Sequence, residues 1–189
     1  VDYEIGRLLD ALDQSKYAEN TAIVLWSDHG WHLGEKEHWG KWTGWERSTR
    51  VPLIIVPPKS AAGRFAKAGS RCDQPVGLID LYPTLMDLAD IKSNNKGLEG
   101  TSFKPLLETP RLKWKSAAFS KYGPARSLVT NQFNYAEFND GQKMLFDLSA
   151  DPDENINLAA SPEHEKTLNR LGNMLNDGWS KVLPSETKH

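Results

Sequence analysis

The stretch Thr21-Ala22-Ile23-Val24-Leu25-Trp26, followed directly by Ser27-Asp28-His29-Gly30, decides the fold expected of this chain. Its first six residues form a short apolar run, which fits a strand buried on both faces of a sheet. Before it, residues 1 to about 17 place apolar side chains at helical spacing: Ile5, Leu8, Leu9 and Leu12. A helix followed by such a strand is half of a parallel crossover unit and predicts an α/β domain.

A second apolar strand is expected at Val51 to Val56, after a long polar and aromatic loop at residues 27–50. Prolines at both ends of this strand favour an edge or near-edge position. Asp80 is placed to cap a helix with apolar positions Leu81, Leu85, Leu88 and Ala89.

The pattern changes near residue 112. Four short strands with close turns are expected at residues 116–121, 125–130, 133–138 and 143–148. Asn139-Asp140-Gly141 is a favourable hairpin turn, and a last helix is expected from Ser161, its cap, to Asn176. The sequence therefore predicts an α/β part, residues 1–112, and a small α+β part, residues 113–189.

Composition excludes several classes of protein. Apolar residues make up 39% of the 189 residues and charged residues 25%, as in ordinary globular proteins. The net charge of -2 includes no basic excess for binding nucleic acid. The longest apolar stretch, residues 51–58, is far shorter than the roughly 20 residues of a membrane helix. The single cysteine, Cys72, excludes an internal disulfide.

Asp28 and His29 follow the first strand directly, and ligands bind outside the carboxyl ends of strands in open parallel sheets. This adjacent carboxylate and imidazole could hold a metal ion; alternatively, Asp28 caps a turn and His29 is merely exposed. The loop contains three histidines, His29, His32 and His38, and two glutamates lie between the last two of them, Glu35 and Glu37. This group raises the possibility of a zinc site. No H-E-x-x-H or H-x-x-E-H motif is present, so a hard cation bound through Asp28 ranks above zinc.

Lys41 lies in the same loop among tryptophans. Trp39, Trp42 and Trp45 flank it, which favours a lysine directed at an anion over a solvated charge. These rings, together with Trp31, could stack on a sugar, although packing is the expected role of at least half of the four.

Taken together, the loop and the segments after it resemble the sulfatase family, in particular its iduronate-2-sulfatase-like and bacterial branch. The resemblance is carried by residues 25–35, 39–41, 48–55, 74–76, 78–85, 145–148, 151–154 and 157–158, in this order. It implies that residues 1–112 are the C-terminal part of an alkaline-phosphatase-like mixed sheet with flanking helices, followed by a small antiparallel sheet and helix. It also implies a periplasmic or secreted location.

The resemblance implies roles for individual residues. Asp28 and His29 match positions at a calcium ion, and His29 and Lys41 match catalytic positions. Lys41 would contact a sulfate oxygen, and Trp42 and Arg126 are further candidates for contacting substrate, with a solvated Arg126 as the alternative. The substrate class would be a sulfated glycan or a small organic sulfate. In this family the nucleophile is a formylglycine made from the Cys or Ser of a C-x-P-x-R motif.

That motif is absent from the chain. Cys72 is followed by Gln74 where the motif needs Pro, and by Val76 where it needs Arg. The chain, which begins with Val1, is therefore expected to be a C-terminal portion, inactive alone, that pairs with the N-terminal part of the same enzyme or with itself. The alternatives are a phosphatase, a phosphonate or phosphodiester hydrolase of the same superfold, and a non-catalytic anion-binding relative.

Overall fold

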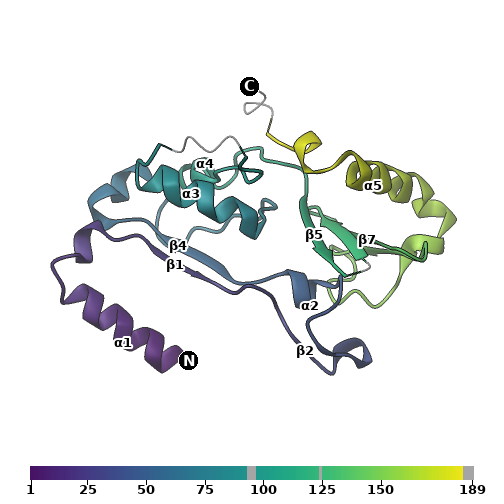
Figure 1. Cartoon of the computed structure of the whole chain (residues 1–189), viewed down its shortest axis with the longest axis horizontal. Coiled ribbons are helices and arrows are strands. Elements are labelled where there is room, and N and C mark those ends of the chain that lie inside the picture. The colour runs from purple at the N-terminus through teal and green to yellow at the C-terminus, as the bar shows by residue number, and fades with distance from the viewer. Residues whose placement is uncertain (93–96, 124, 185–189) are drawn as a thin grey trace.

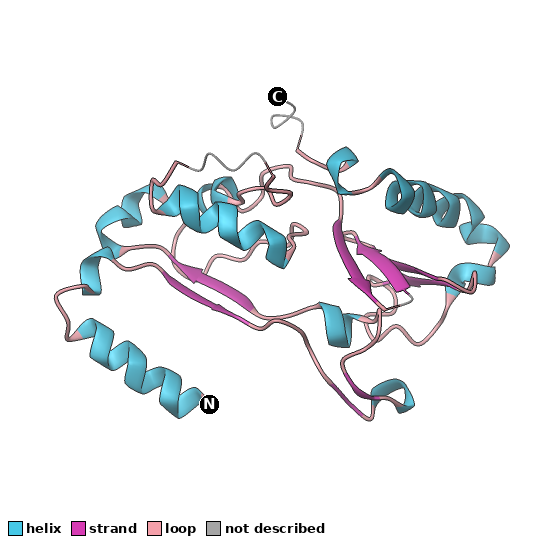
Figure 2. Cartoon of the chain, in the orientation of Figure 1, coloured by secondary structure: helices cyan, strands magenta, loops and turns pink. Residues whose placement is uncertain are grey.

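A computed structural model describes residues 1–92, 97–123 and 125–184. Figure 1 and Figure 2 show a first part with paired strands and several helices, and a second part with a sheet and a long helix. The sheet of the second part has four strands. The elements are α1 (Asp2–Asp13), β1 (Ile23–Trp26), β2 (His32–Leu33), β3 (Trp39–Gly40), α2 (Glu46–Thr49), β4 (Leu53–Val56), α3 (Leu81–Leu88), α4 (Lys104–Glu108), β5 (Ala118–Tyr122), β6 (Ala125–Val129), β7 (Phe133–Phe138), β8 (Lys143–Asp147) and α5 (Glu165–Asp177).

The two strands of the first part pair with each other. β1 and β4 run antiparallel, with Ile23 opposite Val56 and Trp26 opposite Leu53. One face of the pair packs on α3 and α4, where Val24, Leu53 and Ile55 join a core formed by Leu81, Phe103, Leu106 and Trp114.

The expectation that these strands are buried on both faces is wrong for the described chain. Burial alternates along β4, and Ile54 on its second face remains 56% exposed. The reason is that α3 and α4 cover one face, as Figure 1 shows above β4, whereas α1 on the other side buries none of its residues. The apolar sequence of β1 and β4 is suited to a sheet covered on both faces, but the described residues cover only one face of the pair.

The predicted first helix is present as α1, but nothing described covers its apolar side. None of its residues is buried, and Leu8 is 72% exposed. An ion pair of 3.0 Å between Asp13, at the C-terminal end of α1, and Lys59, which follows β4, connects the helix to the strand pair. An amphipathic helix with a bare apolar face is one that lacks its packing partner.

The second part confirms the four predicted strands. They form an antiparallel sheet in the order β5-β6-β7-β8, and the predicted hairpin turn joins β7 to β8 with Gly141 in the left-handed region, φ 87°. The helix α5 packs on this sheet, and the two share a core that includes Leu128, Tyr135, Leu145 and Leu171. The segment between residues 113 and 184 thus has its own hydrophobic cluster.

Two predicted helix caps are wrong in detail. Ser161 makes no side-chain cap bond, because a 3₁₀ turn at Pro162–His164 intervenes and α5 begins at Glu165. Asp80 occupies the N-cap position of α3 as expected, but its side chain makes no cap bond. None of the described helices is long and apolar enough to cross a membrane.

Asp80 instead ties two segments of the first part to the start of the second. It is fully buried, and its carboxylate accepts bonds from the backbone amides of Gly77 (2.7 Å) and Thr101 (2.8 Å). The ammonium of Lys115 completes the set at 2.5 Å and is itself almost completely buried. A buried charge needs such partners, since unpaired burial is strongly unfavourable.

We therefore expect Asp80→Asn to destabilise the fold severely. The variant leaves the Lys115 ammonium buried beside a neutral amide, which costs about 3–5 kcal/mol of unfolding free energy. Urea unfolding followed by circular dichroism measures the loss. Glu4→Gln, which breaks the exposed pair between Glu4 and Arg7, is the control and should change nothing measurable. Equal effects of the two substitutions would contradict this role of Asp80.

Candidate active site

The loop between β1 and β4 is folded rather than irregular. It contains the short hairpin of β2 and β3 and the one-turn helix α2. The amide of Gly30 donates to the carbonyl of Ser48 at 2.8 Å, which closes the loop across its base. A side chain at Gly30 is impossible here, since a Cβ atom would lie 1.9 Å from the carbonyl oxygen of Arg47.

This closed loop brings three predicted site residues together. The Lys41 ammonium lies 2.7 Å from Nε2 of His29, and a carboxylate oxygen of Asp28 lies 3.3 Å from the same nitrogen. Nδ1 of His29 is 2.8 Å from the carbonyl oxygen of Gly30, which can only accept. His29 therefore carries its proton on Nδ1, and its Nε2 lone pair accepts from Lys41. A carboxylate, an imidazole lone pair and an ammonium thus converge at the end of β1.

A series of buried polar side chains holds the loop that carries this site. Nε2 of the fully buried His32 lies 2.9 Å from the hydroxyl of Thr43, which lies 2.8 Å from that of Ser48. Nδ1 of His32 faces the carbonyl oxygen of Glu35 at 3.2 Å and must donate to it. A neutral His32 satisfies every bond if Ser48 donates to Thr43 and Thr43 donates to Nε2. Burial, the largest effect, lowers the pKa of His32 and favours this neutral form.

The histidine cluster considered for zinc is not a metal site in this arrangement. His32 uses both ring nitrogens internally and contacts His38 edge-to-face at 5.2 Å between ring centroids. Glu35 directs its carboxylate at the amide of Leu33, 2.7 Å away. Across residues 1–92, 97–123 and 125–184, no three His, Cys, Asp or Glu side chains are grouped to hold a metal ion.

The tryptophans divide between surface and packing. Trp31, Trp39 and Trp42 are exposed, and the Lys41 ammonium lies 5.6 Å from the centre of the Trp42 ring. Trp45 is the exception, because it packs edge-on against His32 with its ring nitrogen buried. For Trp45 the packing explanation is correct, while Trp42 stays beside the candidate anion-binding lysine.

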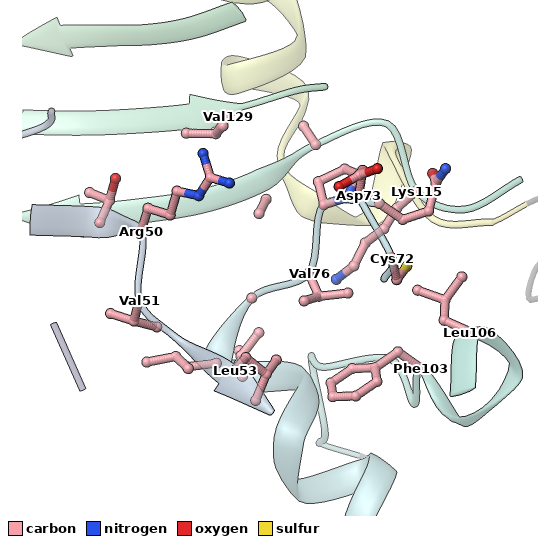
Figure 3. Close-up of a pocket in the computed structure, with 18 of the residues that line it drawn as sticks. Arg50, Val51, Leu53, Cys72, Asp73, Val76, Phe103, Leu106, Lys115 and Val129 are labelled. Atoms are coloured by element: carbon pink, nitrogen blue, oxygen red, sulfur yellow. The ribbon is translucent and has the colours of Figure 1, made fainter. Parts of the chain in front are cut away.

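A cleft of about 1900 Å³ runs from the candidate site between the two parts of the chain. Figure 3 shows Arg50 and Leu53 from the first part and Val129 from the second among its lining residues. Cys72 is exposed on its wall, which agrees with a loop residue rather than a nucleophile held beside Lys41.

Arg126 also lines this cleft but is not free there. Its guanidinium donates to a carboxylate oxygen of Glu137 at 3.1 Å and to the amide oxygen of Asn176 at 3.0 Å. A substrate contact by Arg126 remains a prediction, and these two partners would compete with it.

Sequence reasoning missed two residues that hold the site's loop. Glu154 and Asn134 lie more than 80 residues beyond the loop and yet contact its backbone at Glu46 and Gly44. The segment Asp151-Pro152-Asp153-Glu154 is part of the resemblance, but local pattern carries no information about a partner so distant in sequence.

Comparison with known proteins shows the family and the fold of this chain. Residues 1–91 match the family model described as Sulfatase. A protein named Sulfatase from Formosa agariphila is 35% identical over 176 residues, which cover 93% of this chain and 33% of that protein. The solved structure of BT4656 with D-glucosamine-2-N,6-O-disulfate is 31% identical with a TM-score of 0.77, covering 94% of this chain and 37% of the other. A phosphonate monoester hydrolase from Silicibacter pomeroyi is 27% identical with a TM-score of 0.80, covering 100% and 40%.

The fold and the converging side chains define an α/β domain of the alkaline-phosphatase-like class with a charged site at a strand end. The chain belongs to the sulfatase family. It spans about a third of the length of the curated relatives that it matches.

The lowered pKa of His32 has a consequence for stability. The unfolded chain takes up a proton near the ordinary value of 6.5, which the folded chain resists. The stability contributed by neutral His32 is therefore complete above about pH 6.5 and is lost as the pH falls through the folded pKa. We expect the unfolding free energy to fall more steeply below about pH 6.5 in the wild type than in His32→Gln. Urea unfolding at a series of pH values measures both slopes, and parallel slopes would contradict this account.

Proposed function

We propose that this chain is part of an enzyme that hydrolyses sulfate esters. The observation that carries the proposal is the convergence of Lys41, His29 and Asp28 at the end of β1. An ammonium beside a cation-binding pair suits a substrate whose reacting group is a compact anion. Membership of the sulfatase family supports sulfate as that anion.

Lys41 is the residue proposed to bind a sulfate oxygen. Its ammonium is already directed into the site by His29 at 2.7 Å and by the neighbouring Trp42 ring. Positive charge fixed beforehand at this point would stabilise negative charge as it develops on the sulfate oxygens. His29 orients the ammonium through its Nε2 lone pair.

Asp28 fits one ligand of a calcium site, since its carboxylate is open to further ligands. His29 lies beside it, but its one free lone pair, on Nε2, already accepts from Lys41, so His29 could bind the ion only if this bond were released. Calcium takes about 6–8 oxygen ligands, so most of them would come from residues beyond this pair. Calcium, when bound, would supply positive charge beside the sulfate.

The proposed nucleophile, a formylglycine, requires residues that this chain lacks. We propose that the chain is completed by the N-terminal part of the same enzyme, since its relatives are about three times as long. The bare faces of α1 and of β1 and β4 support this, because Leu8 and Ile54 are apolar and exposed. The chain alone is then inactive. A periplasmic or secreted location is part of the same proposal.

A sulfated glycan is the proposed substrate class, with a small organic sulfate next. The exposed rings of Trp31, Trp39 and Trp42 beside Lys41 support a sugar, which stacks on aromatic surfaces. The similar protein BT4656 was solved in complex with its substrate, a disulfated glucosamine, which agrees with this choice.

A phosphonate or phosphate ester is the second candidate. The likeness to the Silicibacter pomeroyi phosphonate monoester hydrolase specifically favours it, since that structure aligns over the whole chain. Both substrates are compact anions that Lys41 could bind.

The decisive experiment compares the product of the whole gene with the 189-residue chain. We expect the whole product to hydrolyse 4-nitrophenyl sulfate faster than 4-nitrophenyl phosphate or a phenylphosphonate ester, and to lose this activity with a calcium chelator. The chain alone should show no turnover above background. Preference for the phosphorus esters would establish the second candidate instead, and turnover by the chain alone would overturn the proposed completion.

Lys41→Met tests the anion-binding role in the whole product. The substitution keeps the length of the side chain and removes the charge, so we expect kcat/KM for the sulfate ester to fall by about 100-fold or more. Circular dichroism and thermal unfolding should remain unchanged. A loss of less than threefold, with the fold intact, would remove Lys41 from the site.

A further inference from the structure

Glu154 is a buried carboxylate of the second part that contacts the loop carrying Lys41. The residue is 4% exposed and follows the four-stranded sheet. One carboxylate oxygen accepts from the backbone amide of Glu46 at 2.8 Å, and the other accepts from the side-chain amide of Asn134. Both oxygens are therefore used, and one of them holds the first residue of α2.

Asn134 adds a second bond from the sheet to the same loop. Its side-chain nitrogen donates to the carbonyl of Gly44 at 2.9 Å as well as to Glu154. The two neighbours of this nitrogen are both pure acceptors, so the amide group can have only this orientation. Gly44 also lies flat on the sheet, since a Cβ atom there would touch Ala136 at 3.4 Å.

The other side of the loop is anchored to the same residue. The Lys36 ammonium, between β2 and β3, donates to the backbone carbonyl of Glu154 at 2.7 Å and to Asn155 at 2.8 Å. Lys36 and Glu154 both have left-handed backbones, with φ of 58° and 55°. Non-glycine residues rarely adopt this conformation unless their surroundings enforce it. The bond from Lys36 to Glu154 thus joins two residues with this uncommon backbone conformation.

These contacts bracket Lys41. Lys36 and Glu46 are five residues before and five residues after it, and Glu154 holds both. His29 has its own anchor through the Gly30 and Ser48 pair. The position of the Lys41 ammonium relative to His29 therefore depends on a segment whose two ends are tied to the second part.

The carboxylate is held there at an energetic cost. Burial, the largest effect, raises the pKa of Glu154, and its bonds with Asn134 and with the Glu46 amide oppose this. The charged groups that face it are Glu46 on α2 and Lys36 on the hairpin. With one oxygen on the Glu46 amide and the other on Asn134, the carboxylate can hold the loop and the sheet at once, which suits a positioning role.

We propose that Glu154 is a positioning residue for Lys41, acting with Asn134 to clamp residues 36–46 onto the second part. The clamp itself does not depend on which reaction the enzyme catalyses. The effect on catalysis through Lys41 rests on the proposed function. The small sheet and helix thereby act on the site through the backbone of the loop rather than by contacting substrate.

The clamp is tested first by hydrogen exchange on the product of the whole gene. Glu154→Gln keeps the shape but turns an acceptor into a donor, which must face either the Glu46 amide or Asn134. We expect the Glu46 amide to exchange roughly 10- to 100-fold faster, while the amides of β7 keep their protection. Lys36→Met, a second and milder variant, should accelerate exchange at the hairpin. Glu165→Gln, the same chemical change on exposed α5, is the matched control and should leave Glu46 unchanged.

Unaltered exchange at Glu46 in Glu154→Gln would overturn the clamp, and so would an equal loss of protection throughout β7, because that result would mark a purely global effect. The measurement needs no enzymatic activity. Failure of the clamp and failure of the proposed sulfatase activity can therefore be told apart.

A double-mutant cycle in the whole product tests the catalytic consequence. We expect Glu154→Gln to lower kcat/KM for the sulfate ester by about tenfold when Lys41 is present. In the Lys41→Met background the same substitution should change kcat/KM by less than twofold, since its effect passes through Lys41. Equal effects in both backgrounds would show that Glu154 supports the fold without positioning this lysine.

Discussion

The close passage of Gly30 beside Arg47 is the constraint on which the candidate site depends. The backbone bond from Gly30 to Ser48 closes the loop at its base, and the missing side chain at Gly30 permits it. With the base closed, His29 and Lys41 face each other although they are twelve residues apart. Any larger residue at position 30 would separate the start of the loop from α2 and, with it, the imidazole from the ammonium.

Two polar networks then hold the closed loop from different directions. His32, Thr43 and Ser48 join the hairpin to α2 inside the first part. Glu154 and Asn134 join the loop to the second part. The His32 network is satisfied in one geometry only, so it favours that geometry, because an unmade buried bond is costly. In the second network both oxygens of Glu154 are bonded, while the side-chain oxygen of Asn134 is buried without a described partner. The charged residues of the site consequently lie on a segment restrained on both sides.

The arrangement also separates packing from chemistry. The two hydrophobic clusters lie on either side of the cleft, one under α3 and α4 and one under α5. The site occupies the polar loop between them, where Asp28 and Trp42 remain accessible. The bare apolar faces of α1 and β4 belong to neither cluster, which is why we propose that a further part of the enzyme covers them.

The sequence alone was sufficient for features that depend on local pattern. Short strand patterns with close turns, among them Asn139-Asp140-Gly141, predicted the four strands of the sheet. The position of Asp28 and His29 after a strand led to the site prediction, and the structure shows these side chains close together. It was insufficient where side chains meet partners distant in the chain. Asp80 was expected to cap a helix and instead pairs with Lys115, and Glu154 received no role at all. The apolar run of β4 predicted two covered faces, but only the tertiary structure shows which face the described helices reach. The local pattern of apolar and polar residues indicates whether a side chain will be buried. Which residue it then contacts depends on segments distant in the sequence, which only the folded chain brings together.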